Sequence, residues 1–208
     1  ADELRFDLRL GAGAAWRRPE RARDPKPSGP LGRHPGCVDP AAVSDALRRQ
    51  PAPPGSPLAL WLAAEAERCV IPSVTGLLSG TIDLLLRVGD GAERRYLVVD
   101  YKTNRIRSGE APRYDSAALE WEMARAGYFL QSLVYTLALH RHLGLRLRGY
   151  DYDRDVGGYL YLFLRGMGGP ATPRDAATGR CHGVYPGRWT REVVEALDVA
   201  LCPGEGTP

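Results

Sequence analysis

The fold is decided by two neighbouring runs, Gly80-Thr-Ile-Asp83-Leu-Leu-Leu-Arg-Val88 and Tyr96-Leu-Val-Val-Asp100-Tyr-Lys102-Thr-Asn104. Both runs are rich in the apolar and β-branched residues that favour strands, and Gly89-Asp-Gly-Ala92 between them is typical of a turn. The sequence therefore predicts a β-hairpin with strands over 76–88 and 95–102. Each predicted strand carries one aspartate.

Hydrophobic periodicity outside the hairpin predicts further strands and helices. Alternating polar and apolar residues indicate a strand over 2–10, and a nearly continuous apolar run indicates a buried strand over 157–165. Helices are expected over 57–68, 115–143 and 190–201, the second of them as one long helix or two abutting helices. This order of elements indicates an α/β fold with a mixed β-sheet flanked by helices.

Proline content separates an irregular segment from the rest of the chain. Ten of the 17 prolines fall between residues 19 and 57, so we expect a Pro/Arg-rich flexible insertion at about 16–57. A loop is also expected over 170–186. With 208 residues, of which 44% are hydrophobic, residues 1–208 are expected to form one domain. The chain begins with Ala1 rather than Met, and we expect it to be a fragment of a larger protein.

Composition and motif searches mainly exclude functions. The formal net charge of +3 is compatible with nucleic-acid binding but does not argue for it. There is no run of about 20 apolar residues for a membrane span, and no Gly-x-x-x-x-Gly-Lys-Ser/Thr loop for an ATP-driven motor. The four cysteines form no Cys-x-x-Cys pair, which argues against zinc and iron–sulfur sites and favours a reducing, cytoplasmic location. Asp151-Tyr-Asp-Arg-Asp155 lacks the glycine and the glutamate that a calcium loop requires.

Asp83, Asp100 and Lys102 have the chemistry of a metal-dependent phosphodiesterase. In paired strands, the two carboxylates and the backbone carbonyl of Tyr101 offer the oxygen ligands that Mg²⁺ prefers. Lys102 follows Asp100 by two residues and therefore lies on the same face of its strand. It is one of only two lysines, the other being Lys26, among 28 lysines and arginines. A lysine ammonium is a compact charge that can orient a water or a phosphate.

Simpler interpretations exist for each of these residues. Lys102 could form a surface ion pair with one aspartate, but both aspartates interrupt apolar strands, where an unpaired carboxylate is costly to bury. Gln131 and Tyr135 lie four residues apart on one face of the long predicted helix. They could be supporting polar groups of a site or core residues that form hydrogen bonds with each other or with their neighbours. Three arginines follow the second strand: Arg105, Arg107 and Arg113. They could contact the DNA backbone or belong to a solvated loop.

Together, these motifs resemble the C-terminal nuclease domain of RecB-type helicase-nucleases, in the PD-(D/E)xK nuclease superfamily. The resemblance covers residues 76–168, and the matching segments are 80–87, 96–104, 131–143 and 150–167. It implies a restriction-endonuclease-like fold and Mg²⁺-dependent cleavage of DNA, of the exodeoxyribonuclease V type, in double-strand break repair and recombination. It also implies RecC- and RecD-type partner subunits in the full protein, and single strands emerging from a duplex as the substrate.

The resemblance also implies roles for individual residues, and one role that this chain leaves unfilled. The implied roles are metal ligation for Asp83, Asp100 and Tyr101, positioning of the nucleophilic water for Lys102, and support beside the phosphate for Gln131 and Tyr135.

RecB-like nucleases place a further metal ligand, a histidine, on a helix before the first strand. The four histidines here match no such motif, and His140 and His142 are expected to be solvated groups near a helix end. Either the missing ligand lies upstream of Ala1, or the metal site is incomplete. In the second case the chain would be a nuclease-fold module for DNA or partner-subunit binding.

Overall fold

The computed structural model describes residues 4–10, 40–68, 76–108, 111–176 and 178–201. The strands are β1 (Leu4–Leu10), β2 (Gly76–Ile82), β3 (Leu84–Val88), β4 (Arg95–Lys102), β5 (Arg107–Ser108), β6 (Ala111–Pro112), β7 (Val156–Phe163) and β8 (Val184–Gly187). The α-helices are α1 (Pro40–Arg48), α2 (Pro57–Arg68), α3 (Ser116–Arg125), α4 (Tyr128–Arg146), α5 (Tyr152–Asp155) and α6 (Arg191–Leu201). Short 3₁₀ helices occur at Gly91–Glu93, Leu164–Gly166 and Gly169–Ala171.

The central sheet is mixed, with the strand order β3-β4-β7-β8. β4 pairs antiparallel with β3 and parallel with β7, and β7 pairs antiparallel with β8. β1 and β2 form a separate antiparallel ribbon, and β5 and β6 form a small hairpin. The predicted α/β fold with a mixed sheet is therefore confirmed.

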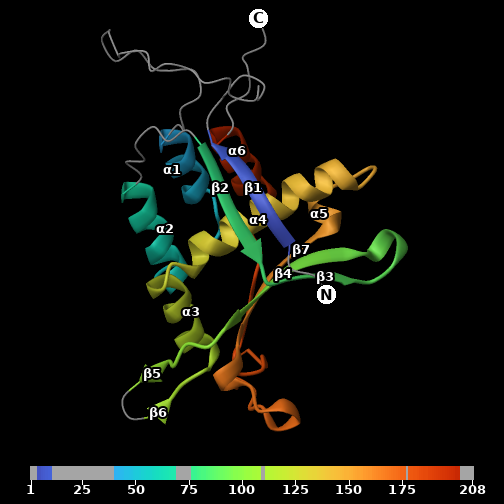
Figure 1. Ribbon diagram of the computed structural model, residues 1–208. Coiled ribbons are helices and arrows are strands. Elements are labelled where there is room, and N and C mark those ends of the chain that lie inside the picture. The colour runs from blue at the N-terminus through green and yellow to red at the C-terminus, as the bar shows by residue number, and fades with distance from the viewer. Residues whose placement is uncertain (1–3, 11–39, 69–75, 109–110, 177, 202–208) are drawn as a thin grey trace, which may run out of the picture.

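The longest helix, α4, links these sheets. It contacts β4 and β7 of the central sheet and also β1 of the ribbon, and α6 packs against it. Helices α1, α2 and α3 continue from α6 around the same side of the molecule, as Figure 1 shows. None of the helices within the described residues is long and apolar enough to cross a membrane.

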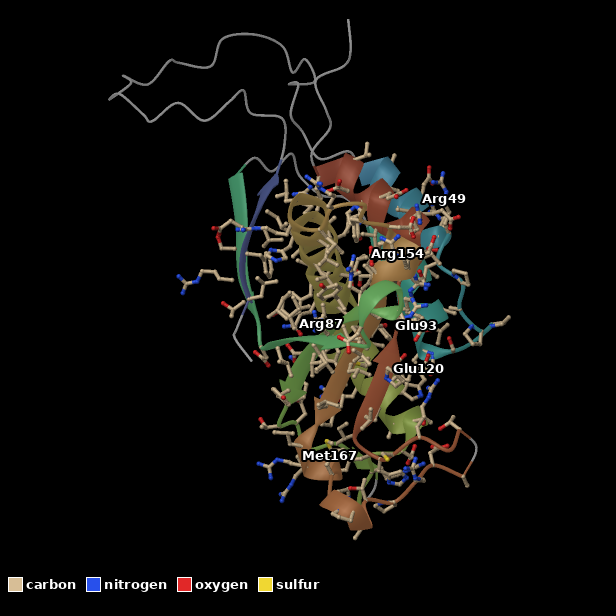
Figure 2. All side chains as sticks on the ribbon, turned by 90° about the vertical axis from the view of Figure 1, so that its right-hand side faces the viewer. Arg49, Arg87, Glu93, Glu120, Arg154 and Met167 are labelled. Atoms are coloured by element: carbon tan, nitrogen blue, oxygen red, sulfur yellow. The ribbon has the colours of Figure 1, made fainter. Side chains whose placement is uncertain are left out.

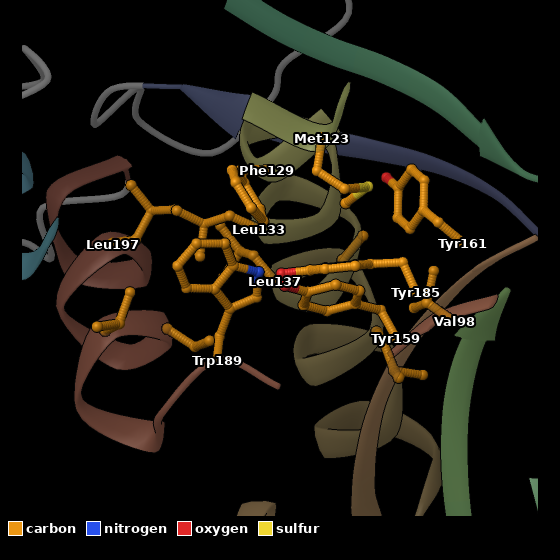
Figure 3. Close-up of a cluster of buried hydrophobic side chains, with 14 of the residues drawn as sticks. Val98, Met123, Phe129, Leu133, Leu137, Tyr159, Tyr161, Tyr185, Trp189 and Leu197 are labelled. Carbon is orange, nitrogen blue, oxygen red and sulfur yellow. The ribbon is translucent and has the colours of Figure 1, made fainter. Parts of the chain in front are cut away.

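The buried cluster in Figure 3 combines side chains of α3, α4 and α6 with those of strands β4, β7 and β8. Trp189 is 1% exposed, and its indole Nε1 donates a hydrogen bond to Ser132 Oγ at 3.0 Å. Tyr159 packs against the same indole, with 6.2 Å between the ring centroids. Because the buried polar groups of this cluster have partners, α4 is held against the sheet by apolar burial without a hydrogen-bond penalty.

The structure corrects the predicted strand over 76–88. That segment bends at Asp83, so β2 pairs with β1 in the ribbon, whereas β3 pairs with β4 in the central sheet. The β3–β4 hairpin itself is confirmed as part of the central sheet, and its turn extends to the right in Figure 1. Its charged residues Arg87 and Glu93 are labelled in Figure 2. The apolar pattern continues through both strands, and so it gave no sign that they belong to different sheets.

Two segments expected to be irregular contain regular structure. Helix α1 lies within the segment 16–57, so the loop prediction is wrong there, while residues 16–39 lie outside the described residues. Its Ser44 Oγ donates to the carbonyl of Ala66 in α2 at 2.7 Å, so packing against α2 overrides the surrounding prolines. Strand β8 lies at the end of the predicted loop 170–186, where pairing with β7 outweighs the weak local propensity of a proline-containing segment.

The long predicted helix is two helices. Gly127 separates α3 from α4 and adopts a left-handed conformation, with φ of 72°. Glycine adopts this conformation without steric cost, which explains why the chain turns at the only glycine of that segment. Helix α4 then ends at Arg146, a little beyond the predicted end at residue 143.

A bulge in β7 sets the register that the candidate site needs. Tyr96 pairs with Val156 but Leu97 pairs with Gly158, so Gly157 is an extra residue. Gly158 has φ of 116°, and a Cβ there would lie 2.3 Å from the carbonyl oxygen of Gly187. Because a one-residue shift moves every side chain of a strand to the other face, this bulge decides which side chains of β7 face α4.

Gly158→Ala is therefore expected to lower the free energy of unfolding by roughly 2–5 kcal/mol, because it adds both backbone strain and a backbone clash. The matched control is Gly144→Ala in α4, where the nearest atom to an added Cβ is 3.9 Å away. That change should raise the free energy of unfolding by about 0.5–1 kcal/mol. Urea denaturation measures both values, and equal stability of the two variants would contradict the bulge.

Candidate active site

Asp83 and Asp100 approach each other where the ribbon meets the central sheet. Leu84 pairs with Val99, and continuing this register places Asp83 across from Asp100. Asp83 Oδ2 accepts a hydrogen bond from the backbone N–H of Tyr101 at 3.0 Å. The Asp83 side chain is exposed, whereas Asp100 is only 2% exposed. One carboxylate is thus open to solvent and the other is enclosed.

Burial dominates the electrostatics of Asp100. It raises the pKa of the Asp100 carboxyl, an effect that the neighbouring Lys102 ammonium opposes and the charge of Asp83 reinforces. Asp100 Oδ2 lies 2.6 Å from Lys102 Nζ, yet no hydrogen bond of normal geometry reaches this buried oxygen from the described residues. The oxygen therefore keeps a lone pair that a further cation could use.

Lys102 is held from several sides. Its Nζ donates a hydrogen bond to Gln131 Oε1 at 3.0 Å in addition to the ion pair with Asp100. The same ammonium lies 4.1 Å from the ring centroid of Tyr128, within the range of a cation–π interaction. Its side chain is 12% exposed, so its position is fixed by these contacts rather than by solvent.

Gln131 is oriented by the groups around it. Its Oε1 also accepts from the hydroxyl of Tyr161 at 3.1 Å, and its Nε2 donates to the hydroxyl of Tyr135 at 3.0 Å. Burial raises the pKa of Tyr135, and therefore its hydroxyl keeps its proton at neutral pH. The structure thus brings Gln131 and Tyr135 together with Asp83, Asp100 and Lys102.

The sequence did not point to two aromatic members of this cluster. Tyr128 precedes Gln131 by three residues on α4, so helical spacing could have found it. Tyr161 pairs with Asp100 across β4 and β7, which requires knowledge of the strand pairing. Asn104 was also missed as a bridge: its Nδ2 donates to Glu122 Oε1 at 2.7 Å and its Oδ1 accepts from Tyr128 at 3.0 Å.

The donor set fits a hard divalent cation with few protein ligands. Mg²⁺ commonly keeps several waters and takes one or two carboxylates, which Asp83 and Asp100 can provide. Within the part of the chain that the structure describes, no group of three or more His, Cys, Asp or Glu residues could hold a metal ion. The fit of a divalent cation therefore depends on the buried Asp100 Oδ2 and on the exposed carboxylate of Asp83.

The histidines do not join this site in the described residues, and one prediction about them is wrong. His140 is not a solvated cap: its Nδ1 lies 2.9 Å from the hydroxyl of Tyr150, and its ring contacts Tyr150 and Tyr152. Burial accordingly lowers the pKa of His140. His34 lies outside the described residues.

Most of the chain is similar to known proteins. Residues 12–199 match the family model of the PD-(D/E)XK nuclease superfamily. The chain is similar to the RecBCD enzyme subunit RecB of Mycolicibacterium smegmatis, with 37% identity over 168 residues, or 77% of this chain. It is 43% identical over 62% of its length to the subunit of the same name from Mycobacterium tuberculosis, and 44% identical over 45% of its length to that of Escherichia coli. It spans 15%, 11% and 8% of these three relatives.

Asp100→Asn is expected to raise the melting temperature of the metal-free protein, because it removes a charge that burial penalises and keeps the shape of the side chain. The raised pKa means that the folded state binds a proton more tightly than the unfolded state. The parent therefore loses stability relative to the variant as pH rises above the usual aspartate value of 3.8, and the difference should be larger at neutral pH than in acid. Thermal unfolding in a chelator measures it.

The control for this prediction is Asp90→Asn in the β3–β4 hairpin, where the carboxylate is 94% exposed. This change should leave the melting temperature nearly unaltered at both pH values. A lower melting temperature for Asp100→Asn than for the parent at neutral pH would show that the charged carboxylate stabilises the fold.

Proposed function

Because this chain belongs to the PD-(D/E)XK nuclease superfamily, we propose that it is the magnesium-dependent deoxyribonuclease domain of a RecB-type helicase-nuclease. The observation that carries the proposal is the buried Asp100–Lys102 pair, which lies beside Asp83 and is held by Gln131 of α4. Metal dependence is general in this superfamily. The specific assignment of Mg²⁺ rests on the oxygen donors and the small number of protein ligands.

In this proposal, Asp83, Asp100 and the backbone carbonyl of Tyr101 hold the metal ion. When bound, Mg²⁺ would neutralise charge on the phosphate and make water a better nucleophile. Lys102 Nζ donates one N–H to Gln131 and forms an ion pair with Asp100, which leaves an N–H that can hold the attacking water or a non-bridging phosphate oxygen. Its fixed position places that water without reorganisation during the reaction.

Tyr135 is proposed to contact the phosphate directly. Its hydroxyl oxygen accepts from Gln131 Nε2, which leaves its own proton free to donate to a phosphate oxygen. The raised pKa keeps that proton in place at neutral pH. Gln131 would then act as a positioning residue that ties Lys102 and Tyr135 to one geometry.

The biological setting is proposed from the relatives, which are named as RecB subunits of RecBCD enzymes. We infer a cytoplasmic exodeoxyribonuclease that cuts single strands as they emerge from a duplex during double-strand break repair and recombination. RecC- and RecD-type subunits would be its partners in the full protein. Helicase activity would belong to other parts of that protein.

Asp100→Ala and Lys102→Ala are each expected to lower the rate of DNA cleavage in Mg²⁺ by at least about 100-fold, because one removes a metal ligand and the other the group that orients the water. Release of labelled nucleotides from single-stranded DNA measures the rate. Asp90→Ala in the exposed hairpin should cleave like the parent. If either site variant also did so, the roles proposed for the site would be wrong.

A catalytically incomplete module is the second candidate, and the observation that favours it is the lack of a third His, Cys, Asp or Glu ligand in the described residues. For the complete-site proposal, Mg²⁺ at about 100 times its Kd should stabilise the parent by roughly 2.7 kcal/mol and should not stabilise Asp100→Ala. A parent that responds only as part of a full-length protein would place the missing ligand outside this chain. A parent that responds in neither form would favour the binding module.

A further inference from the structure

A groove between α2 and α3 lies outside the roles assigned so far. Its volume is about 850 Å³, and the buried side chains of Trp61 and Ile106 contribute to its lining. Two exposed apolar side chains also line it: Leu60 of α2, which is 51% exposed, and Trp121 of α3, which is 58% exposed. Trp121 makes no hydrogen bond or aromatic contact with other described residues. An indole so exposed beside an apolar groove suits a flat apolar ligand.

The groove shares a wall with the candidate active site. Glu122 lines the groove and accepts the 2.7 Å hydrogen bond from Asn104, which follows Lys102 by two residues. Asn104 in turn accepts from Tyr128, the residue whose ring lies below the Lys102 ammonium. Ile106 of the same loop forms part of the groove and accepts a backbone hydrogen bond from Arg113. The segment that leaves the site after Lys102 therefore becomes one side of the groove.

Two exposed arginines of the groove can contact a polyanion. Arg113 and Arg125 line it, and their side chains are 52% and 73% exposed. Each pairs with a neighbouring carboxylate, Asp115 or Glu122, but a guanidinium has five N–H donors, more than these pairs use. The remaining donors can contact phosphate oxygens at the edge of an apolar surface.

We propose that this groove binds nucleobases of the single-stranded DNA next to the phosphate being cleaved, with Trp121 as the stacking platform and Arg113 and Arg125 on the backbone. The inference rests on the proposed function and adds a substrate subsite to it. Aromatic faces combined with positive charge are the usual means of binding single strands, and they accept any base sequence. In duplex DNA the base faces are already stacked, and so the groove selects for single strands.

The first test measures binding alone, in a chelator, with a fluorescently labelled oligothymidylate and the full chain. Trp121→Ala should weaken binding by about 5- to 100-fold, the range expected for loss of one stacked base. Trp121→Phe keeps an aromatic face and should restore most of the affinity, whereas Trp121→Leu keeps only apolar contact and should not. The control is Leu145→Ala, at an 86% exposed position of α4 outside the groove lining.

The second test measures cleavage in Mg²⁺. Trp121→Ala should raise KM for an oligonucleotide by the same factor and leave kcat within about twofold, because the interaction is made in the ground state and the transition state alike. An oligonucleotide of abasic residues, which has no base to stack on Trp121, should show no difference between parent and variant.

The outcomes separate the two proposals. If Asp100→Ala stops cleavage but Trp121→Ala binds and cuts DNA like the parent, the groove is not a DNA subsite and the proposed function stands. If Trp121→Ala keeps its DNA affinity but weakens association with partner subunits, the groove is a protein-docking surface and the inference is overturned. If the parent neither binds nor cuts single strands, the proposed function fails, and this inference fails with it.

Discussion

The candidate site depends on one interaction, the 2.6 Å ion pair between the buried Asp100 carboxylate and the Lys102 ammonium. A carboxylate enclosed in a sheet is costly when it has no charge partner, and a pair repays the cost only when both members are held in place. Strand β4 supplies both charges on one face, but it cannot fix the end of a long lysine side chain. Gln131 and Tyr128 of α4 do so, and the packing of α4 on the sheet and the geometry of the pair therefore depend on each other.

The orientation of the Gln131 amide follows from its neighbours. Lys102 and Tyr161 both donate to its oxygen, while its nitrogen donates to Tyr135, and reversing the amide would set donor against donor. Tyr161 reaches this position because the bulge at Gly157 sets the register of β7 beside β4. A backbone irregularity thus fixes the direction of a hydrogen-bond network on the neighbouring helix.

Local pattern and tertiary pairing explain what could be predicted from the sequence. Hydrophobic periodicities of two and 3.6 residues can be read directly from the sequence. They predict the β3–β4 hairpin, the α/β class and the common face of Asp100 and Lys102. The bend at Asp83 could not be predicted, because β2 and β3 follow one another without a turn signal and only their pairing partners differ. Helix α1 and strand β8 likewise form through contacts with distant segments and against their local composition.

The two carboxylates of the site contribute in different ways to the metal-free fold. Asp83 is solvated and anchored by a backbone N–H, so its charge costs little. Asp100 is enclosed, and the nearby charge of Asp83 adds to the penalty of its burial. A divalent cation bound by Asp83 and Asp100 would offset both negative charges. Its binding would therefore recover the stability that the two carboxylates cost the metal-free fold. In the proposed metal site, the lower stability at Asp100 would therefore favour metal binding, and the lysine beside it limits how large that cost can become.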